Sequence, residues 1–361
     1  MEGRGRPLNA SRPLRRYGPG MRAMVIERLG PVREGDSPLT AVERPEPTPG
    51  AGEVLIRVSA CGVCHTELDE IEGRTPPPRL PVIPGHQVVG RIASVGPGVT
   101  DRAPGERVGA AWIFRADGQC AFCRRGDENL CPHFAATGRD ADGGYAEAMV
   151  APADFVHAIP EGIGDAEAAP LLCAGAVGYR SLRLTNLRDG ERLGLTGFGA
   201  SAHLVLQLAR HQFPRSPVFV FARHEAERAF ARELGAAWTG DTQERAPEKL
   251  DAIIDTTPAW APIVAALENL DRGGRLVINA IRKEDGDKTA LQRLDYAEHL
   301  WLEREVKSVA NVSRRDVTEL LRLAAEIPLR PEVEEYPLSD ANRALVDLRA
   351  RRIRGAKVLR V

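Results

Sequence analysis

The sequence lacks any apolar run that approaches the ~20 residues of a membrane-spanning helix. It also lacks a strong excess of charge, since 49 Lys and Arg residues against 50 Asp and Glu residues give a net charge of −1. No global field therefore attracts the chain to nucleic acid or to an anionic membrane. Because 43% of its 361 residues are hydrophobic, we expect a folded, soluble protein long enough for two domains.

The first 20 residues lack the apolar core of a secretory signal and carry five arginines against one glutamate. A transit peptide can be Arg-rich, but Pro and Gly oppose an amphipathic helix here. We therefore expect residues 1–20 to be a disordered tail, or to precede the true start at Met21, and we expect a cytoplasmic protein. In a reducing compartment, the six cysteines are more suited to metal binding than to disulfides.

Two patterns of apolar residues divide the rest of the chain. Residues 21–174 contain short β-branched runs such as GEVLIRVSACGVC, GHQVVGRIASVGPGV and GERVGAAWIF, which predict an antiparallel, barrel-like domain. In residues 175–311, strands such as RLGLTG, PVFVFA, DAIIDT, RLVINA and VKSVAN alternate with helical segments, which predicts a doubly wound parallel sheet of the α/β class. Residues 312–361 end in AKVLRV, and this lone strand is expected to rejoin the sheet of the first domain.

The first strand-to-helix turn of the predicted parallel sheet, GFGASA, matches the dinucleotide-binding pattern G-x-G-x-x-A. Gly197 permits the tight turn, Gly199 lets the backbone approach a pyrophosphate, and Ala202 lets the helix pack close to the strand. The N-terminus of that helix offers free N–H groups to phosphates. Because an apolar strand precedes the turn and an amphipathic helix follows, we favour a cofactor site over a structural turn. Its residues are Gly197, Gly199, Ala200, Ser201 and Ala202.

The end of the second strand indicates which dinucleotide is preferred. An NAD-binding site usually has Asp or Glu there to bind the ribose hydroxyls, but this chain has Ala222. Arg223, His224 and Arg228 follow, and an arginine can bind a 2′-phosphate bidentately. We therefore expect NADP(H) to be preferred over NAD(H); the alternative is that these residues are ordinary surface charges.

Three cysteines lie close together in DGQCAFCRRGDENLC, namely Cys120, Cys123 and Cys131. A tetrahedral zinc site needs four ligands, and the register C-x-x-C-x-x-C-x7-C places the first at Asp117. Asp117 is therefore either an unusual fourth ligand or the mark of a site that has lost its zinc.

Three other motifs carry metal-ligand side chains in order: ACGVCHTELDEIEG with Cys64, PGHQVVG with His86, and APLLCAGAVGYRSL with Cys173. With the nucleotide turn after them, residues 21–361 resemble the zinc-dependent medium-chain alcohol dehydrogenases, in a bacterial branch near the cinnamyl alcohol dehydrogenases. The resemblance implies a GroES-like catalytic domain, a Rossmann domain, and a catalytic zinc with these three residues as ligands. Two thiolates and one imidazole suit zinc and leave a fourth position open for water or substrate.

The resemblance also implies an activity, the reversible transfer of hydride between a primary aromatic or medium-chain alcohol, or its aldehyde, and NAD(P)(H). Thr66 matches the hydroxyl that takes the substrate proton. His65 and Arg354 match residues that contact the cofactor pyrophosphate, and Trp112 matches an aromatic wall of the substrate pocket. Relatives dimerise by joining their nucleotide-domain sheets edge to edge, and VKSVAN is a plausible edge strand for such a contact, so we expect a homodimer or homotetramer.

Three positions depart from the family pattern. Gln87 follows His86 where the family has glutamate, so the shape is kept but the charge is lost. Asp69 stands where relatives often have the histidine that ends the proton relay. Asp69 or bulk water would complete the relay, although a carboxyl with a pKa near ~4 is a weaker base. Asp117 replaces the first of four cysteines that bind a structural zinc; carboxylates bind zinc at about 2.0–2.2 Å, so we expect two zinc ions per chain rather than an empty or oxidised loop.

Other functions are less compatible with these motifs. A polyol dehydrogenase of the same superfamily tends to have glutamate where Cys173 stands. Quinone reductases and non-catalytic nucleotide-binding relatives lack the set Cys64, His86 and Cys173. An NAD-preferring alcohol dehydrogenase remains an alternative, and Cys61 is expected to be a small buried residue without a further role.

Overall fold

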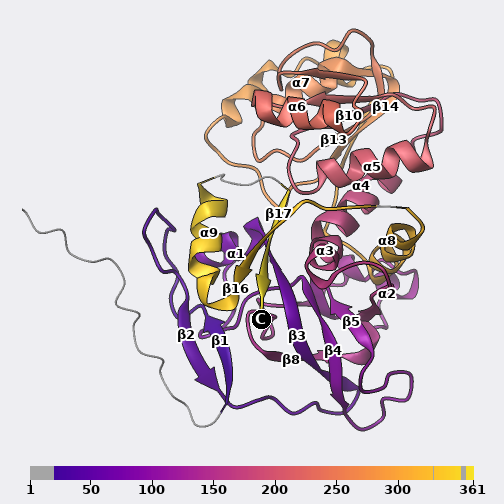
Figure 1. Ribbon diagram of the computed structural model, residues 1–361. Helices are drawn as coiled ribbons and strands as arrows, with labels where there is room; N and C mark the ends of the chain where they lie inside the picture. The colour runs from indigo at the N-terminus through magenta and orange to yellow at the C-terminus, as the bar shows by residue number, and fades with distance from the viewer. Residues whose placement is uncertain (1–19, 328, 351–354) are drawn as a thin grey trace, which may run out of the picture.

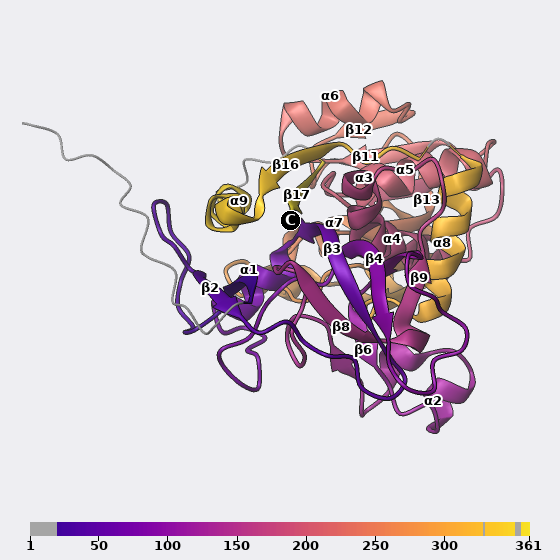
Figure 2. The ribbon, with the colours of Figure 1, turned by 60° about the horizontal axis from the view of Figure 1, so that its bottom comes forward.

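The computed structural model describes residues 20–327, 329–350 and 355–361. Figure 1 shows a β-rich part at the bottom and a part built around a parallel sheet at the top, and Figure 2 turns the molecule so that its bottom comes forward. The predicted tail 1–20 lies outside the described residues except for Gly20.

The upper part contains a six-stranded sheet in which all neighbouring strands are parallel. The strand order is β12-β11-β10-β13-β14-β15, so the direction of winding reverses between β10 and β13. In such sheets a ligand binds at the carboxyl ends of the strands at this switch point. The doubly wound fold class is therefore confirmed. The strands are β10 (Leu193–Thr196), β11 (Val218–Phe221), β12 (Trp238–Gly240), β13 (Leu250–Asp255), β14 (Leu270–Ile278) and β15 (Glu305–Ser308).

Helices cover both faces of this sheet because successive strand residues point to opposite sides. Ile254 and Val277 pack in the core shared with α4, α5 and α8, whereas Ile253 and Leu276 pack in a second core with α7. The predicted alternation of apolar strands and amphipathic helices therefore forms two buried layers. The covering helices are α4 (Ala176–Thr185), α5 (Ala202–Gln212), α6 (Glu225–Glu233) and α7 (Ala261–Asn269), and α8 (Arg314–Glu326) packs against α4.

The lower part contains a seven-stranded sheet with the path β16-β17-β3-β4-β5-β9, on which β8 pairs with β3. The segment GERVGAAWIF is not one strand, since β5 ends at Ala110 and β6 begins at Ile113 to pair with β7. Trp112 lies at this break. β1 pairs with β2, and β6 with β7, outside this sheet. The strands of the whole lower part are β1 (Met21–Val25), β2 (Thr40–Arg44), β3 (Glu53–Val63), β4 (Val88–Val95), β5 (Arg107–Ala110), β6 (Ile113–Arg115), β7 (Ala135–Ala136), β8 (Ala148–Pro152), β9 (Val156–Ala158), β16 (Val333–Pro337) and β17 (Ala356–Arg360).

The C-terminal strand lies in the lower sheet, beside β3 (Figure 1). β17 pairs antiparallel with β3, placing Leu359 opposite Cys61. Before it, α8 packs against α4 and β9 at the junction of the two parts. The chain therefore enters the upper part once and returns. The other α-helices of the described residues are α1 (His65–Ile71), α2 (Ala121–Arg124), α3 (Asp165–Pro170) and α9 (Ala341–Arg349), and the π-helix η3 (Leu171–Gly175) joins α3 to α4.

Candidate active site

Cys64 is held at the point where β3 ends and α1 begins. It is the N-cap of α1, and its Sγ accepts a hydrogen bond from the Thr66 N–H at 3.3 Å. Glu67 completes a capping box, since its Oε2 accepts the Cys64 N–H at 2.8 Å. The helix start therefore fixes the direction of the Cys64 sulfur.

His86 and Cys173 arrive from distant segments. Gly85 precedes His86 with φ +102°, and a Cβ added there would lie 2.4 Å from the Tyr145 ring, so glycine is required. Cys173 lies in η3. His86 Nε2 lies 3.3 Å from Cys173 Sγ and 3.8 Å from Cys64 Sγ, and the three donor atoms all lie within 4.8 Å of one another.

These separations fit a zinc ion. With Zn–S near 2.3 Å and Zn–N near 2.0 Å, the donors of a tetrahedral site are about 3.5–3.8 Å apart. Two sulfurs and one imidazole nitrogen at these distances can hold zinc and leave one coordination position for a water or a substrate oxygen. The residues would therefore form the protein's share of a catalytic metal site.

Glu67 supports this site and was missed at the sequence level. Its Oε1 lies 2.6 Å from His86 Nδ1, and the side chain is fully buried. Since Nε2 faces the sulfurs, Nδ1 carries the proton that Glu67 accepts, which fixes the ring and its tautomer. The signal was present as an acid three residues after Cys64, the N3 position of a capping box, but cysteine is not a usual N-cap.

Burial and neighbouring charges shift the pKa values of His86 and Cys64. Burial lowers the pKa of His86, but the Glu67 carboxylate and the Cys64 sulfur outweigh it and hold this pKa well above its usual value. The adjoining Cys173 sulfur, and then burial, raise the pKa of the Cys64 thiol. A divalent ion would favour the deprotonated donors instead, so metal binding would release protons.

Three predicted residues surround this cluster. The Thr66 hydroxyl lies 3.3 Å from Cys64 Sγ and is buried. The Trp112 ring meets His86 edge-on, with ring centroids 5.1 Å apart. Gln87 is buried against β3, where the N–H of Gly62 donates to the Gln87 carbonyl at 3.0 Å. The structure therefore brings Thr66, Trp112 and Gln87 to the predicted metal site.

Asp69 has neighbours that the relay hypothesis does not include. Its Oδ1 accepts hydrogen bonds from Arg74 Nε at 2.6 Å and from Arg282 Nε at 3.0 Å, and the carboxylate is buried. Asp69 therefore balances two guanidinium groups, and its part in a proton relay stays a prediction. His65 is exposed at the start of α1, and Arg354 lies outside the described residues.

The predicted nucleotide turn lies at the switch point of the sheet. Gly197 has φ +81°, and a Cβ there would lie 2.7 Å from Thr256 Oγ1. A Cβ at Gly199 would meet nothing within 4 Å, so this side of the turn is open. Ala202 is buried at the first position of α5, and Ser201 Oγ donates to the carbonyl of Ala174 at 2.9 Å. The turn thus lies next to the segment that carries Cys173.

The residues after β11 form the predicted 2′-phosphate site. Arg223 and His224 are exposed. Arg228 is more constrained, since its Nη1 donates to the carbonyl of Ala222 at 2.7 Å and its Nε donates to Glu225 at 2.9 Å. Arg223 therefore has more freedom than Arg228 to meet a phosphate.

The second predicted cluster is also assembled. Asp117, Cys120, Cys123 and Cys131 present donor atoms that all lie within 4.8 Å of one another. Asp117 Oδ1 accepts the Cys120 N–H at 2.9 Å, and Oδ2 lies 3.0 Å from His133 Nδ1. The carboxylate is thus oriented as ligand oxygens usually are, and one oxygen and three sulfurs suit zinc. His133 is a supporting residue that the sequence analysis missed.

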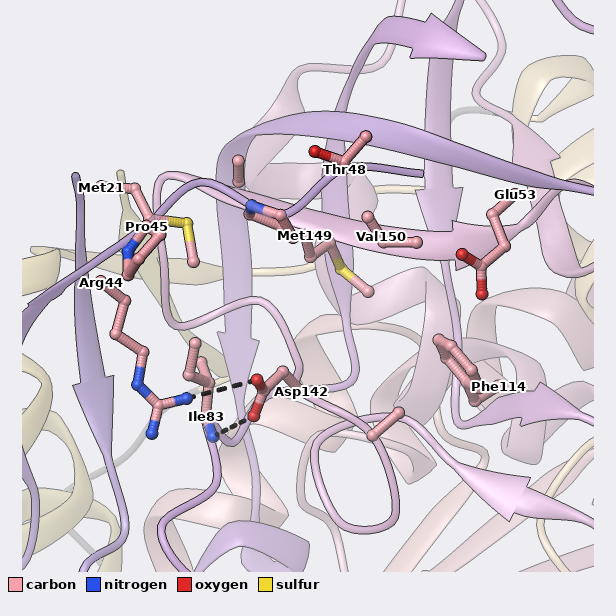
Figure 3. Close-up of a pocket in the computed structure, with 13 residues that line it drawn as sticks. Met21, Arg44, Pro45, Thr48, Glu53, Ile83, Phe114, Asp142, Met149 and Val150 are labelled. Atoms are coloured by element: carbon pink, nitrogen blue, oxygen red, sulfur yellow. Dashed lines mark hydrogen bonds and ion pairs between the residues drawn. The ribbon is translucent and has the colours of Figure 1, made fainter. Parts of the chain in front are cut away.

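A cavity of about 430 Å³ lies elsewhere in the β-rich part, between Met21, Arg44, Asp142 and Phe114 (Figure 3). Arg44 pairs with Asp142 at 3.3 Å across its edge. None of the predicted site residues lines it. Within the described ranges, no helix is long and apolar enough to cross a membrane.

A Rossmann-type sheet joined to a β-rich domain with two sulfurs and an imidazole defines a medium-chain, zinc-dependent dehydrogenase. Residues 50–161 match the alcohol dehydrogenase GroES-like domain and residues 225–359 match the zinc-binding dehydrogenase model. A probable alcohol dehydrogenase of Mycobacterium tuberculosis is 46% identical over 94% of this chain and 97% of that protein. The chain belongs to the zinc-dependent medium-chain alcohol dehydrogenase family, and its class is that of the NAD(P)-dependent alcohol dehydrogenases.

Solved structures agree. A cobalt- and zinc-bound thermostable alcohol dehydrogenase from Pyrobaculum aerophilum is 26% identical, with a TM-score of 0.83 over 94% of this chain and 99% of that chain. A cinnamyl alcohol dehydrogenase from Sorghum bicolor is 26% identical, with a TM-score of 0.80 over 94% and 97%. The predicted family resemblance is confirmed.

Proposed function

We propose that this alcohol dehydrogenase transfers hydride reversibly between a primary aromatic or medium-chain alcohol, or its aldehyde, and NADP(H). The convergence of Cys64, His86 and Cys173 within 4.8 Å carries the proposal. A zinc ion held there would polarise the substrate oxygen, and a nicotinamide at the switch point would exchange the hydride. The zinc in the Pyrobaculum relative supports this choice of ion.

The chain's own residues divide the remaining work. Glu67 orients His86, and the Thr66 hydroxyl, 3.3 Å from Cys64 Sγ, is placed to take the proton of an alcohol beside the sulfur. Trp112 gives the site an aromatic wall. Cys173 in the donor set opposes a polyol dehydrogenase, and the complete set opposes a non-catalytic relative.

The preference for NADP(H) rests on the end of β11. Ala222 offers no carboxylate to repel a 2′-phosphate, and exposed Arg223 can approach one. Arg228 would contribute by holding the carbonyls of Ala222 and Arg223, at 2.7 Å and 3.2 Å. We further propose that Asp117, Cys120, Cys123 and Cys131 hold a second, structural zinc.

We also propose a homodimer or homotetramer in a reducing cytoplasm. β15 is the last strand of the sheet order and all four of its residues are exposed. Exposed apolar side chains lie on β15 and on residues that precede it in the chain, which favours association at this edge. They are Leu294, Tyr296, Leu300, Trp301, Leu302 and Val306. The six cysteines are free, as suits a reducing compartment.

The test is a spectrophotometric assay of NADPH and NADH loss with benzaldehyde and cinnamaldehyde, before and after a chelator, alongside the zinc content. We expect a higher kcat/KM with NADPH, loss of activity with the chelator, and two zinc ions per chain. A higher kcat/KM with NADH would overturn the cofactor preference, and one zinc per chain would overturn the structural site. Absence of turnover by the zinc-loaded protein with any carbonyl or alcohol of a broad panel would overturn the function.

A further inference from the structure

The segment that follows β14, residues 279–284, is held by side chains that point in different directions. Asn279 Nδ2 donates to Ser201 Oγ of the nucleotide turn at 3.3 Å. The Lys283 side chain is 8% exposed; its Nζ pairs with Asp255 at the end of β13 and donates to the carbonyl of Thr257 at 2.7 Å. The backbone N–H of Glu284 donates to the carbonyl of Pro258 at 2.7 Å. These contacts all lie within the upper part of the molecule.

Arg282, in the same segment, reaches the other part. Its Nε donates to Asp69 Oδ1 at 3.0 Å, and Asp69 belongs to α1. The Asp69 side chain is 3% exposed and the Arg282 side chain 30% exposed. Because a buried carboxylate needs its partners more than an exposed one does, this contact ties the segment to the β-rich part of the chain.

Residues 279–284 lie on the side of the sheet toward which the nicotinamide end of the cofactor would extend. The adenosine end of the cofactor belongs at the end of β11, where the ribose is selected. The nicotinamide end must then extend past β13 and β14 toward Cys64, His86 and Cys173. Residues 279–284 leave the carboxyl end of β14 and lie on that side of the switch point.

We propose that Arg282 is a positioning residue for the nicotinamide end of the cofactor: its contact with Asp69 holds residues 279–284 between the two parts of the molecule. Asp69 is then the acceptor of this inter-domain contact and not the end of a proton relay. Arg74, which also pairs with Asp69 at 2.6 Å, keeps the carboxylate in place for Arg282. The inference rests on the proposed function only for the identity of the ligand.

The experiment compares Arg282→Gln, Asp69→Asn and the double variant in the zinc-loaded, full-length protein. Arg293→Gln is the control, because Arg293 is an exposed arginine of the same part of the chain. Each test variant should weaken NADPH binding, followed by nucleotide fluorescence without substrate, by roughly five- to tenfold. The double variant should be no weaker than Asp69→Asn alone, because that variant has already lost the carboxylate that Arg282 contacts. The pH profile of kcat should be unchanged.

A second measurement is independent of the cofactor. The backbone N–H groups of Asn279 and Glu284 are hydrogen-bonded, to the carbonyls of Asp255 and Pro258. Without nucleotide, their hydrogen exchange should be faster in Arg282→Gln and in Asp69→Asn than in the control, because the segment has lost one of its ties.

Two kinds of result would overturn the proposal. The first is additive weakening in the double variant, or unchanged exchange at these two amides. The second is a shifted pH profile of kcat in Asp69→Asn that Arg282→Gln does not share, which would return Asp69 to the relay. Failure of the proposed function is distinguishable, since the wild-type protein would then bind no reduced nicotinamide while the exchange comparison would still decide the contact.

Discussion

Replacement of Glu67 by glutamine tests the support of the metal site most directly. Glu67 is fully buried and accepts two hydrogen bonds, from the Cys64 N–H at 2.8 Å and from His86 Nδ1 at 2.6 Å. Glutamine has nearly the same shape but only one acceptor oxygen. In Glu67→Gln one of the two donors therefore faces an NH₂ group.

The magnitude follows from this lost contact. A hydrogen bond to a charged group contributes roughly 1.5–3 kcal/mol, and about 1.4 kcal/mol corresponds to a tenfold change in an equilibrium constant. Zinc affinity should therefore fall roughly ten- to hundredfold, as is typical for a partner of a ligating histidine. The measurement is competition with a chromophoric chelator, with any zinc bound by the Asp117 cluster counted separately.

Glu70→Gln is the matched control. Glu70 lies on the same helix and is buried, but both of its carboxylate oxygens lack a hydrogen-bond partner among the described residues. This variant should keep the zinc affinity of the wild-type protein. If Glu67→Gln binds zinc as tightly as Glu70→Gln does, the argument that Glu67 fixes His86 is refuted.

Two further predictions concern stability and assembly. Burial, followed by Arg314 and Arg102, lowers the pKa of His157 to about 4, so between that value and about 6.5 the unfolded chain binds more protons. The free energy of unfolding should therefore decrease as the pH is lowered through this window, by about 2 kcal/mol from pH 7 to pH 5. Denaturant unfolding of His157→Gln should show a smaller decrease over the same pH range. An equal decrease in this variant would refute the assignment to His157. Val306, on β15, is 47% exposed, and Val306→Glu should reduce the mass measured by light scattering toward the 39.2 kDa of one chain. Leu29→Glu, at an exposed residue of the other part of the chain, should leave the mass unchanged. If Val306→Glu remains an oligomer, the β15 edge is not the interface.

The sequence predicted features whose signals are local. The nucleotide turn stands between an apolar strand and an amphipathic helix, and β10 and α5 form around it. The strand GERVGAAWIF was predicted too long, because its apolar residues continue through the break at Ala111 and Trp112. Periodicity marks burial and cannot show where a strand changes its pairing partner.

Contacts between residues far apart in the chain could not be predicted from the sequence. Asp69 and Arg282 are separated by 213 positions, and neither lies in a pattern that indicates a charged partner. Glu67 was nearer, three residues after Cys64, but an acid on a helix is usually a solvated charge. The family pattern predicted the types of metal-donor residue and their order in the chain, whereas the orientation of His86 is seen only in the structure.

The short helix α1 therefore contributes both to the predicted metal site and to the contact between the two parts of the chain. In α1, residues two apart lie on different faces, so Glu67 turns to His86 while Asp69 turns to Arg74 and Arg282. Residues three apart share a face, and accordingly burial and then the Glu67 charge raise the pKa of Glu70 well above its usual value. Since Cys64 caps this helix, a shift of α1 would move a metal donor and the Arg282 contact together. The order of acids along α1 thus links the metal site to the contact between the two parts of the chain.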